Sequence, residues 1–96
     1  MVTSVLDLSG RAESLLRILY KEYKRRRASG IIKSEAFAIG DINYIRDSLA
    51  AGLSGSDVDG ASEELYKNNL IFKSLWGYIA LKNEFLDFCE RNYIKV

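Results

Sequence analysis

The 96-residue sequence lacks proline and histidine altogether, and it contains a single cysteine, Cys89. One cysteine rules out an intramolecular disulfide, and a lone cysteine without histidine cannot supply a zinc cluster. The absence of histidine also removes the usual base that activates a serine or cysteine nucleophile. There is no glycine-rich phosphate loop either. We therefore expect a protein that is not an enzyme and that uses no metal and no cofactor.

The sequence also lacks long apolar runs and a strong net charge. Its 14 basic and 13 acidic residues give a formal net charge of +1, so no global field points to nucleic acid or to an anionic membrane. No apolar run approaches the roughly 20 residues that span a bilayer, and the N-terminus does not resemble a signal peptide. With no repeat and no linker-like tract, we expect one cytoplasmic domain over residues 1–96 with a modest core.

Residues 10–28 show the clearest helical pattern in the chain. Ser9 is a suitable N-cap, and Gly30 suits the left-handed residue that commonly follows a helix. The apolar residues at helical spacing form one stripe, made of Ala12, Leu15, Leu16, Leu19, Tyr20 and Tyr23. The preceding residues 1–8 are expected to form either an extra helical turn or an arm that docks on a partner.

Helix starts and turn residues divide the rest of the chain into short elements. In order, these are an extended segment at 31–39, a helix at 41–51, a helix at 56–68, a hairpin at 70–81 and a helix at 83–94. The expected N-caps of the three helices are Asp41, Ser56 and Asn83. Gly77 allows the hairpin to turn tightly, and Asn69 can close the preceding helix in a left-handed conformation. These elements predict a mainly α fold with a small β-hairpin or sheet, which is an α+β fold.

The stretch at 52–71, GLSGSDVDGASEELYKNNLI, organises this pattern. It contains a Gly-Leu-Ser turn, then a helix whose apolar residues face the core. An Asn-Leu-Ile sequence then leads into the hairpin. The residues that define it are Gly52, Leu53, Ser54, Val58, Ala61, Leu65, Asn69, Leu70 and Ile71. This order resembles the turn and second helix of a winged helix-turn-helix domain, and the resemblance covers about residues 10–94.

Within that superfamily the chain is most similar to the small stand-alone winged-helix proteins of Gram-positive bacteria and their mobile elements. It departs from their last motif, because Lys82 replaces a threonine and Phe85 replaces a glycine. The resemblance implies a DNA-binding transcriptional regulator whose helix at 56–68 enters the major groove. The DNA contacts implied for this role are Ser56, Gly60, Glu63 and Lys67 on that helix, and Lys73 on the wing.

The charge of these segments complicates the DNA hypothesis. Residues 52–71 carry four carboxylates against Lys67 alone, a sum of −3, which repels phosphates. The helix at 10–28 carries seven basic and two acidic residues, a sum of +5. Its last turn, Lys24, Arg25, Arg26 and Arg27, is therefore the candidate contact with the DNA backbone. A solvated basic face, or a face that pairs with the acidic helix of another copy, explains this cluster equally well.

The alternative to DNA binding is a winged helix that only contacts proteins, with the acidic helix as the recognition face. If the basic cluster and the helix at 56–68 share one surface, DNA binding is favoured, and if they lie on opposite sides, a protein partner is favoured. Trp76 at the hairpin tip is expected either to pack over the sheet edge or to contact DNA or a protein partner.

The sequence also contains more apolar surface than one small core requires. Ile18 lies near the polar side of the first helix, and the last helix is apolar over a wide arc. The resemblance implies a homodimer formed by the first and last helices, with Ile18, Leu86, Phe88 and Tyr93 as candidate interface residues. Cys89 is expected to be a buried, unreactive thiol.

Overall fold

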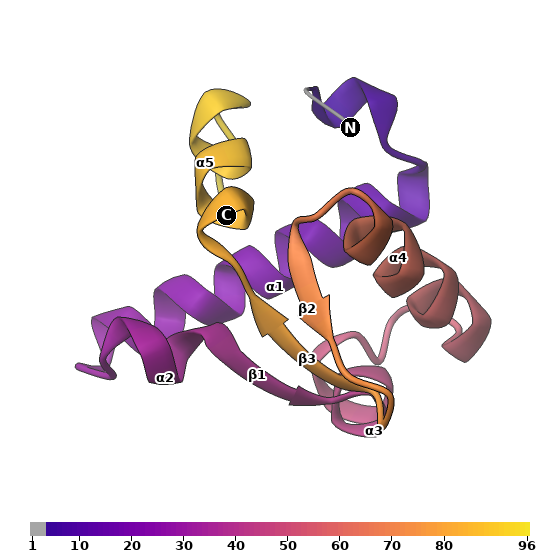
Figure 1. Ribbon diagram of the computed structural model, residues 1–96, viewed down its shortest axis with the longest axis horizontal. Helices are drawn as coiled ribbons and strands as arrows, with labels where there is room; N and C mark the ends of the chain where they lie inside the picture. Colours follow the sequence, from indigo (N-terminus) through magenta and orange to yellow (C-terminus); the bar gives the residue numbers. More distant parts are fainter. Residues whose placement is uncertain (1–3) are drawn as a thin grey trace.

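The computed structural model describes residues 4–96, so the first three residues of the expected N-terminal arm lie outside it. The fold is α+β, mostly helical, with a small three-stranded antiparallel sheet (Figure 1). Its elements are η1 (Val5–Asp7), α1 (Gly10–Ala28), α2 (Lys33–Phe37), β1 (Ala38–Asp41), α3 (Ile42–Tyr44), η2 (Ile45–Leu49), α4 (Gly55–Lys67), β2 (Ile71–Lys73), β3 (Tyr78–Leu81) and α5 (Asn83–Arg91).

Helix α1 has the bounds expected from the sequence. The Ser9 hydroxyl accepts a hydrogen bond from the Ala12 amide at 3.2 Å, which caps the helix as predicted. At the other end Gly30 has a φ of +90°, the left-handed conformation that its lack of a side chain permits. The helix crosses the molecule and contacts α4 and α2.

The segment at 31–39 was predicted to be extended, and this prediction is wrong for most of its length. Residues 33–37 form the short helix α2, and the strand β1 begins only at Ala38. The helical turn buries Ala36 completely. It also brings the centre of the Phe37 ring to 5.4 Å from the centre of the Tyr23 ring. These tertiary contacts outweigh the weak alternation of the sequence.

The two middle helices differ from prediction in their details. Asp41 caps the first as expected, because its carboxylate accepts from the amides of Asn43 and Tyr44. That helix then widens into a π-helical turn, η2. The cap of α4 is Ser54 rather than Ser56, since the Ser54 hydroxyl accepts from the Asp57 amide at 3.1 Å.

The sheet has the order β1-β3-β2, with β3 in the centre and both neighbours antiparallel to it. The hairpin β2–β3 is the one predicted at 70–81. Asn69, just before it, has the expected left-handed φ of +62°. Helix α5 is shorter than predicted. The residue at its N-cap position is Lys82 rather than Asn83, and the Lys82 side chain donates to the Asn69 side chain instead of capping the helix.

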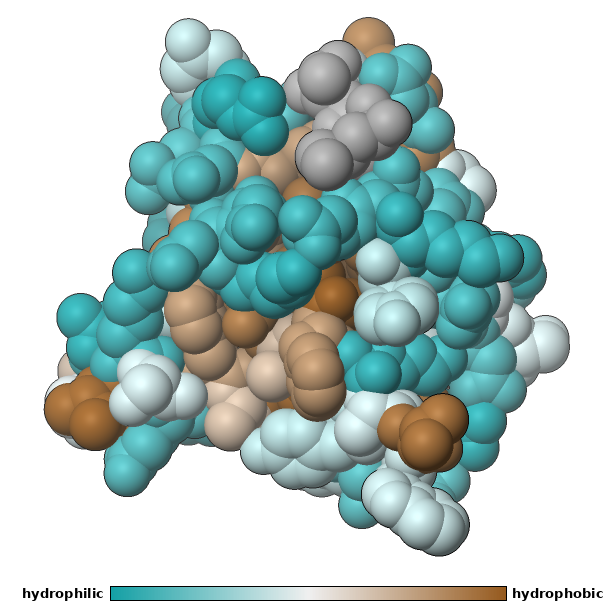
Figure 2. All heavy atoms as spheres, viewed as in Figure 1, coloured by the Kyte–Doolittle hydropathy of each residue, from teal (hydrophilic) through white to brown (hydrophobic). Residues whose placement is uncertain are grey.

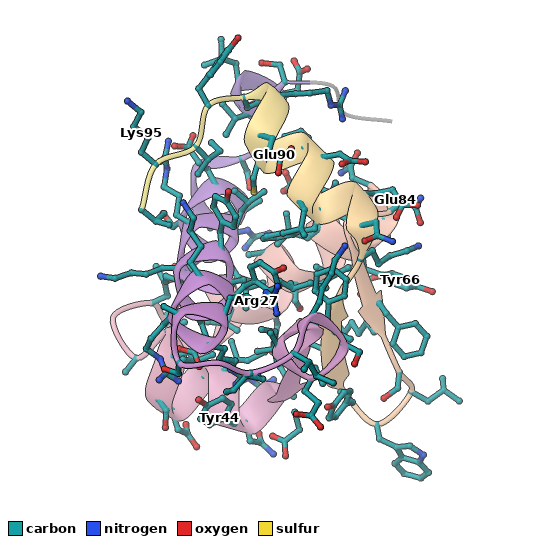
Figure 3. All side chains as sticks on the ribbon, turned by 90° about the vertical axis from the view of Figure 1, so that its left-hand side faces the viewer. Arg27, Tyr44, Tyr66, Glu84, Glu90 and Lys95 are labelled. Carbon is teal, nitrogen blue, oxygen red and sulfur yellow. The ribbon has the colours of Figure 1, made fainter. Side chains whose placement is uncertain are left out.

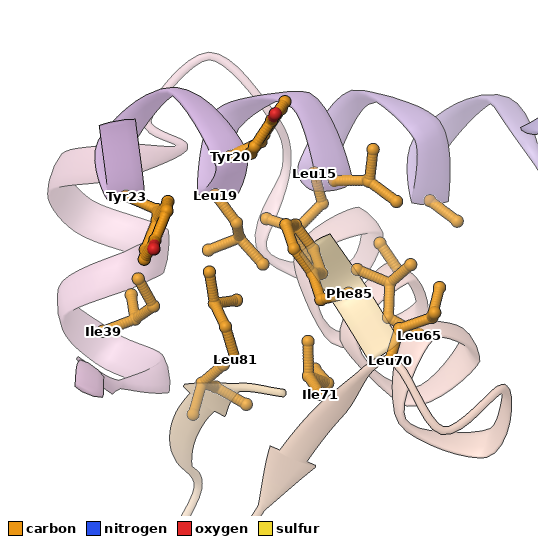
Figure 4. Packing of buried hydrophobic residues seen from close by; sticks show 14 of the residues in the cluster. Leu15, Leu19, Tyr20, Tyr23, Ile39, Leu65, Leu70, Ile71, Leu81 and Phe85 are labelled. Carbon is orange, nitrogen blue, oxygen red and sulfur yellow. The ribbon is translucent and has the colours of Figure 1, made fainter. Parts of the chain in front are cut away.

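The core lies between α1, α4, α5 and the inner face of the sheet. In Figure 4, Leu15 and Leu19 of α1 point towards Phe85 of α5 and Leu81 of β3. Its largest fully buried side chains are Phe85, Phe88, Leu15, Leu16, Leu19, Ile45, Leu65, Ile71, Ile79 and Val58. No helix within residues 4–96 has both the length and the apolarity needed to cross a membrane.

Candidate interaction surface

The outward face of α4 carries the four acidic residues that argued against DNA binding. Each of these carboxylates has a partner outside α4. The Arg11 guanidinium lies 3.8 Å from Asp57, and the Lys73 ammonium lies 3.2 Å from Glu63. The remaining two pairs are Asp59 with Arg46, and Glu64 with the amide and hydroxyl of Ser9. These contacts link α4 to α1, η2 and β2.

The partners change the charge of this face. Residues 52–71 alone sum to −3, but Arg11, Arg46 and Lys73 add three positive charges and bring the local sum to zero. Neither Arg11 nor Arg46 was among the predicted functional residues. Their role depends on contacts between residues far apart in the chain, for which the sequence gives no local signal.

Gly60 allows Arg11 to lie directly against α4. A Cβ atom at residue 60 would be 2.3 Å from the Arg11 Cζ atom, so a side chain here would displace the guanidinium. Together with Lys67, these residues line a shallow groove on the outer side of the helix. The predicted contact Gly60 is thus covered by Arg11, while Lys67 remains exposed. Ser56 is also exposed, beside the Ser54 hydroxyl.

The basic cluster at the end of α1 is partly structural. The Arg26 side chain is only 14% exposed, and it pairs with Glu22 at 2.7 Å. Its guanidinium also donates to the carbonyl oxygens of Ala38 and Ile39, at 2.8 and 3.1 Å. Arg26 therefore joins α1 to β1, an arrangement that disfavours the phosphate contact predicted for it. Hydrogen bonds from Arg25 and Arg26 lower the pKa of Glu22 to about 2.

The other members of the cluster are exposed but also have partners. The Lys24 ammonium lies 4.9 Å from the Tyr20 ring centre, and Arg25 pairs with Glu22. Arg27 donates to the Ile31 carbonyl at 3.0 Å.

The cluster and α4 lie at opposite ends of α1. Helix α4 contacts the first turns of α1 through Ser9 and Arg11, whereas Arg27 is about 24 Å further along the helix axis. In Figure 1 the end of α1 and α2 lie on the left and α4 on the right, and Figure 3 shows Arg27 on the side away from α4. The basic cluster at the end of α1 and the outer face of α4, which were both predicted to contact DNA, therefore do not share one surface.

The hairpin tip presents two apolar side chains to solvent. Leu75 and Trp76 are 101% and 92% exposed, so Trp76 does not pack over the sheet edge. Gly77 makes the turn with a φ of +83°, and the Ser74 hydroxyl accepts from the Tyr78 amide. Lys73, the predicted wing cation, points back from the tip towards Glu63 and Ser62.

Further large aromatic side chains are exposed along the hairpin and at the end of α4. Phe72 and Tyr78 lie on the face of the hairpin opposite the buried Ile71 and Ile79, and both are exposed. Tyr66, in the last turn of α4, is exposed as well (Figure 3). Figure 2 shows apolar side chains gathered over the sheet and at its lower end. We call the set of Tyr66, Phe72, Leu75, Trp76 and Tyr78 the hairpin surface.

The predicted dimer residues do not form one patch. Phe88 is completely buried in the core, so it cannot contact a partner, and its prediction as an interface residue is wrong. Ile18 lies beside Leu49, whereas Leu86 lies beside Tyr20, roughly 200° around α1 from Ile18. Tyr93 is exposed beyond the end of α5. Cys89 is buried as predicted, and burial raises its pKa to about 12.

Searches against protein-family models, curated proteins and solved structures found no match to this chain.

Proposed function

We propose that the chain is a winged-helix domain. Three features support this proposal: the element order, the sheet order β1-β3-β2 and the β2–β3 hairpin that follows α4. In this assignment α3 with η2 is the second helix, α4 is the recognition helix and the hairpin is the wing.

We propose that this domain is a cytoplasmic, non-enzymatic module that binds a protein through α4 and the hairpin surface. The observation that carries the proposal is the exposed pair Leu75 and Trp76 at the wing tip. Exposed aromatic and apolar side chains near one another are typical of protein interfaces, where burial removes them from water. The neutral charge of the α4 face suits a protein partner better than a phosphate backbone.

Photo-cross-linking tests this proposal. A benzoyl-phenylalanine at position 76 should form adducts with protein in the cells that make this chain. The same residue at position 27, on the far side of the molecule, should not. Adducts from position 27 alone would contradict the proposal.

A DNA-binding transcriptional regulator is the second candidate. One observation favours it: the Arg11 guanidinium lies against Gly60 and lines, with Lys67, a groove on the outer side of α4, where the sequence alone predicts a net acidic face. In this role Arg11, Lys67 and the wing would contact the duplex, and Lys24, Arg25 and Arg27 would not share that surface.

A salt series with random duplex DNA tests this second role. Affinity that falls steeply with salt concentration, and that weakens in an Arg11→Ala, Lys67→Ala double variant, would favour DNA binding. An Arg25→Ala, Arg27→Ala variant is the matched control, because it removes the same charge from the far end of α1. Loss of binding in the control alone would place the DNA contact at the end of α1.

A further inference from the structure

A groove lies between the second half of α1 and α5, and it shares no residue with the hairpin surface. Its volume of about 350 Å³ lies within the range of small-molecule sites. It is lined by Tyr20, Tyr23, Lys24, Arg27, Leu86 and Glu90. The four residues from α1 follow helical spacing, so they share one face of that helix. Figure 3 shows Arg27 of α1 and Glu90 of α5 on the same side of the molecule.

Two exposed cations of this groove have no carboxylate partner. The Lys24 ammonium lies over the Tyr20 ring, and the Arg27 guanidinium donates to the Ile31 carbonyl. A guanidinium carries five N–H donors, so most of those of Arg27 remain available. Within residues 4–96 neither side chain forms an ion pair, although these other basic residues do: Arg11, Arg17, Arg25, Arg26, Arg46 and Lys73. An anion can therefore bind Lys24 and Arg27 without displacing a carboxylate.

The two tyrosines of the groove add neutral donors. Both side chains are largely buried, and neither hydroxyl has a hydrogen-bond partner within residues 4–96. No side-chain oxygen in this described part of the chain is both buried and unpaired, so the two hydroxyls reach solvent. Burial raises the pKa of Tyr20 above its ordinary value of 10.0, which keeps its phenol protonated at neutral pH. Tyr20 and Tyr23 can therefore donate to an anion in the groove.

The remaining two residues of the groove limit the charge and size of its ligand. Glu90 is exposed and forms no ion pair within residues 4–96. Two cations and one carboxylate give the lining a net charge of +1, which complements a single negative charge. A polyphosphate or a nucleic-acid backbone would bring further negative charges, which Glu90 repels. Leu86 and the tyrosine rings offer apolar contact to the uncharged part of a ligand.

We propose that this groove binds a small organic monocarboxylate with an apolar body. Lys24 and Arg27 hold the carboxylate, the two phenol hydroxyls add hydrogen bonds, and the apolar body rests against Leu86. This site goes beyond the protein-binding role, because it lies on α1 and α5, whereas the hairpin surface lies on α4, β2, β3 and the turn between the two strands. The two roles are independent of each other.

Titration of the full chain with indole-3-acetate, followed by nuclear magnetic resonance, tests this proposal. A salt concentration of about 0.15 M screens unspecific attraction between distant charges. The amide signals of residues 20–27 and 86–90 should shift, with a dissociation constant of about 1 mM or below. Indole-3-acetamide has the same shape without the charge, and inorganic phosphate has charge without the apolar body. Each should bind at least about tenfold more weakly.

Variants at exposed positions assign the binding to the groove. Lys24→Ala with Arg27→Ala should weaken indole-3-acetate binding by about tenfold or more. Lys21→Ala with Lys67→Ala removes the same charge outside the groove, so binding should stay within about threefold of wild type. Glu90→Gln removes the repelling carboxylate and should tighten binding by about threefold. Circular dichroism and thermal unfolding check that every variant is folded.

Three results would overturn the proposal. The first is that no signal of the groove shifts up to about 10 mM indole-3-acetate. The second is equal binding of indole-3-acetamide, which would show that the carboxylate is not recognised. The third is an equal loss of binding in the two double variants, which would show a response to net charge alone. None of these results bears on cross-linking from position 76, so failure of either role leaves the other standing.

Discussion

The Arg11 guanidinium lies directly against Gly60, so closely that a Cβ atom at residue 60 would be 2.3 Å from its Cζ atom. This contact brings a cation from α1 onto the outer face of α4, next to Asp57. It is one of the pairings that bring the charge of that face to zero. The properties of α4 therefore depend on residues that lie outside it.

Gly60→Ala should be neutral or stabilising. Alanine in a helix interior is better than glycine by about 0.5–1 kcal/mol, and the half-exposed Arg11 side chain can move into solvent. Its ion pair with Asp57 is exposed and contributes at most about 1 kcal/mol. Urea unfolding of Gly60→Ala, Arg11→Ala and the double variant measures the free energy of unfolding of each. A loss above about 1 kcal/mol in Gly60→Ala would show that Arg11 cannot move away.

The free energy of unfolding should depend on pH through Glu22. Its folded pKa of about 2 lies below the ordinary value of 4.5, so the stabilisation is present above about pH 4.5 and is lost as the pH falls towards 2. The full effect is on the order of 3 kcal/mol. Glu22→Gln should lose this pH dependence and be less stable at pH 7. Glu13→Gln, which breaks an exposed pair with Arg17, is the control and should cost less than about 1 kcal/mol.

Ser54 and Ser56 offer a matched test of the cap of α4. Ser54→Ala removes the hydroxyl that accepts from the Asp57 amide and should cost about 1 kcal/mol. Ser56→Ala removes a hydroxyl that caps nothing and should change stability by less than about 0.5 kcal/mol. Equal losses in the two variants, measured by thermal unfolding, would mean that the cap is not Ser54.

The wing tip should matter for binding and not for folding. Leu75→Ser with Trp76→Ser replaces two exposed side chains, so the unfolding free energy should change by less than about 1 kcal/mol. The same double variant should lose the protein complex. Phe85→Ala, in the core, is the contrasting change and should cost about 3–5 kcal/mol. An unstable tip variant would show that Leu75 and Trp76 support the fold.

The sequence predicted elements whose signals are local. The apolar stripe and the caps predicted the bounds of α1 correctly. The Asp41 cap and the left-handed conformation of Asn69 were also predicted, because both depend on residues next to them in the sequence. Residues 33–37 were missed because Ala36 and Phe37 are held by contacts with distant residues. Periodicity alone did not reveal that Phe88 belongs to the core.

The candidate site was less accessible to sequence reasoning. The pairing of Ser9 with Glu64 spans 55 residues, and that of Arg46 with Asp59 joins two separate helices. The charge sum over residues 52–71 therefore overstated the acidity of the α4 face, which is neutral once its partners from other elements are counted. The basic cluster at the end of α1 was conspicuous in the sequence, yet Arg26 turned out to hold β1.

Cross-linking from position 76, compared with position 27, tests the central claim most directly. The adducts are treated separately with nuclease and with protease, which identifies what the wing tip touches. The account predicts nuclease-resistant protein adducts at position 76 and none at position 27. Nuclease-sensitive adducts at position 76, or protein adducts confined to position 27, would contradict it.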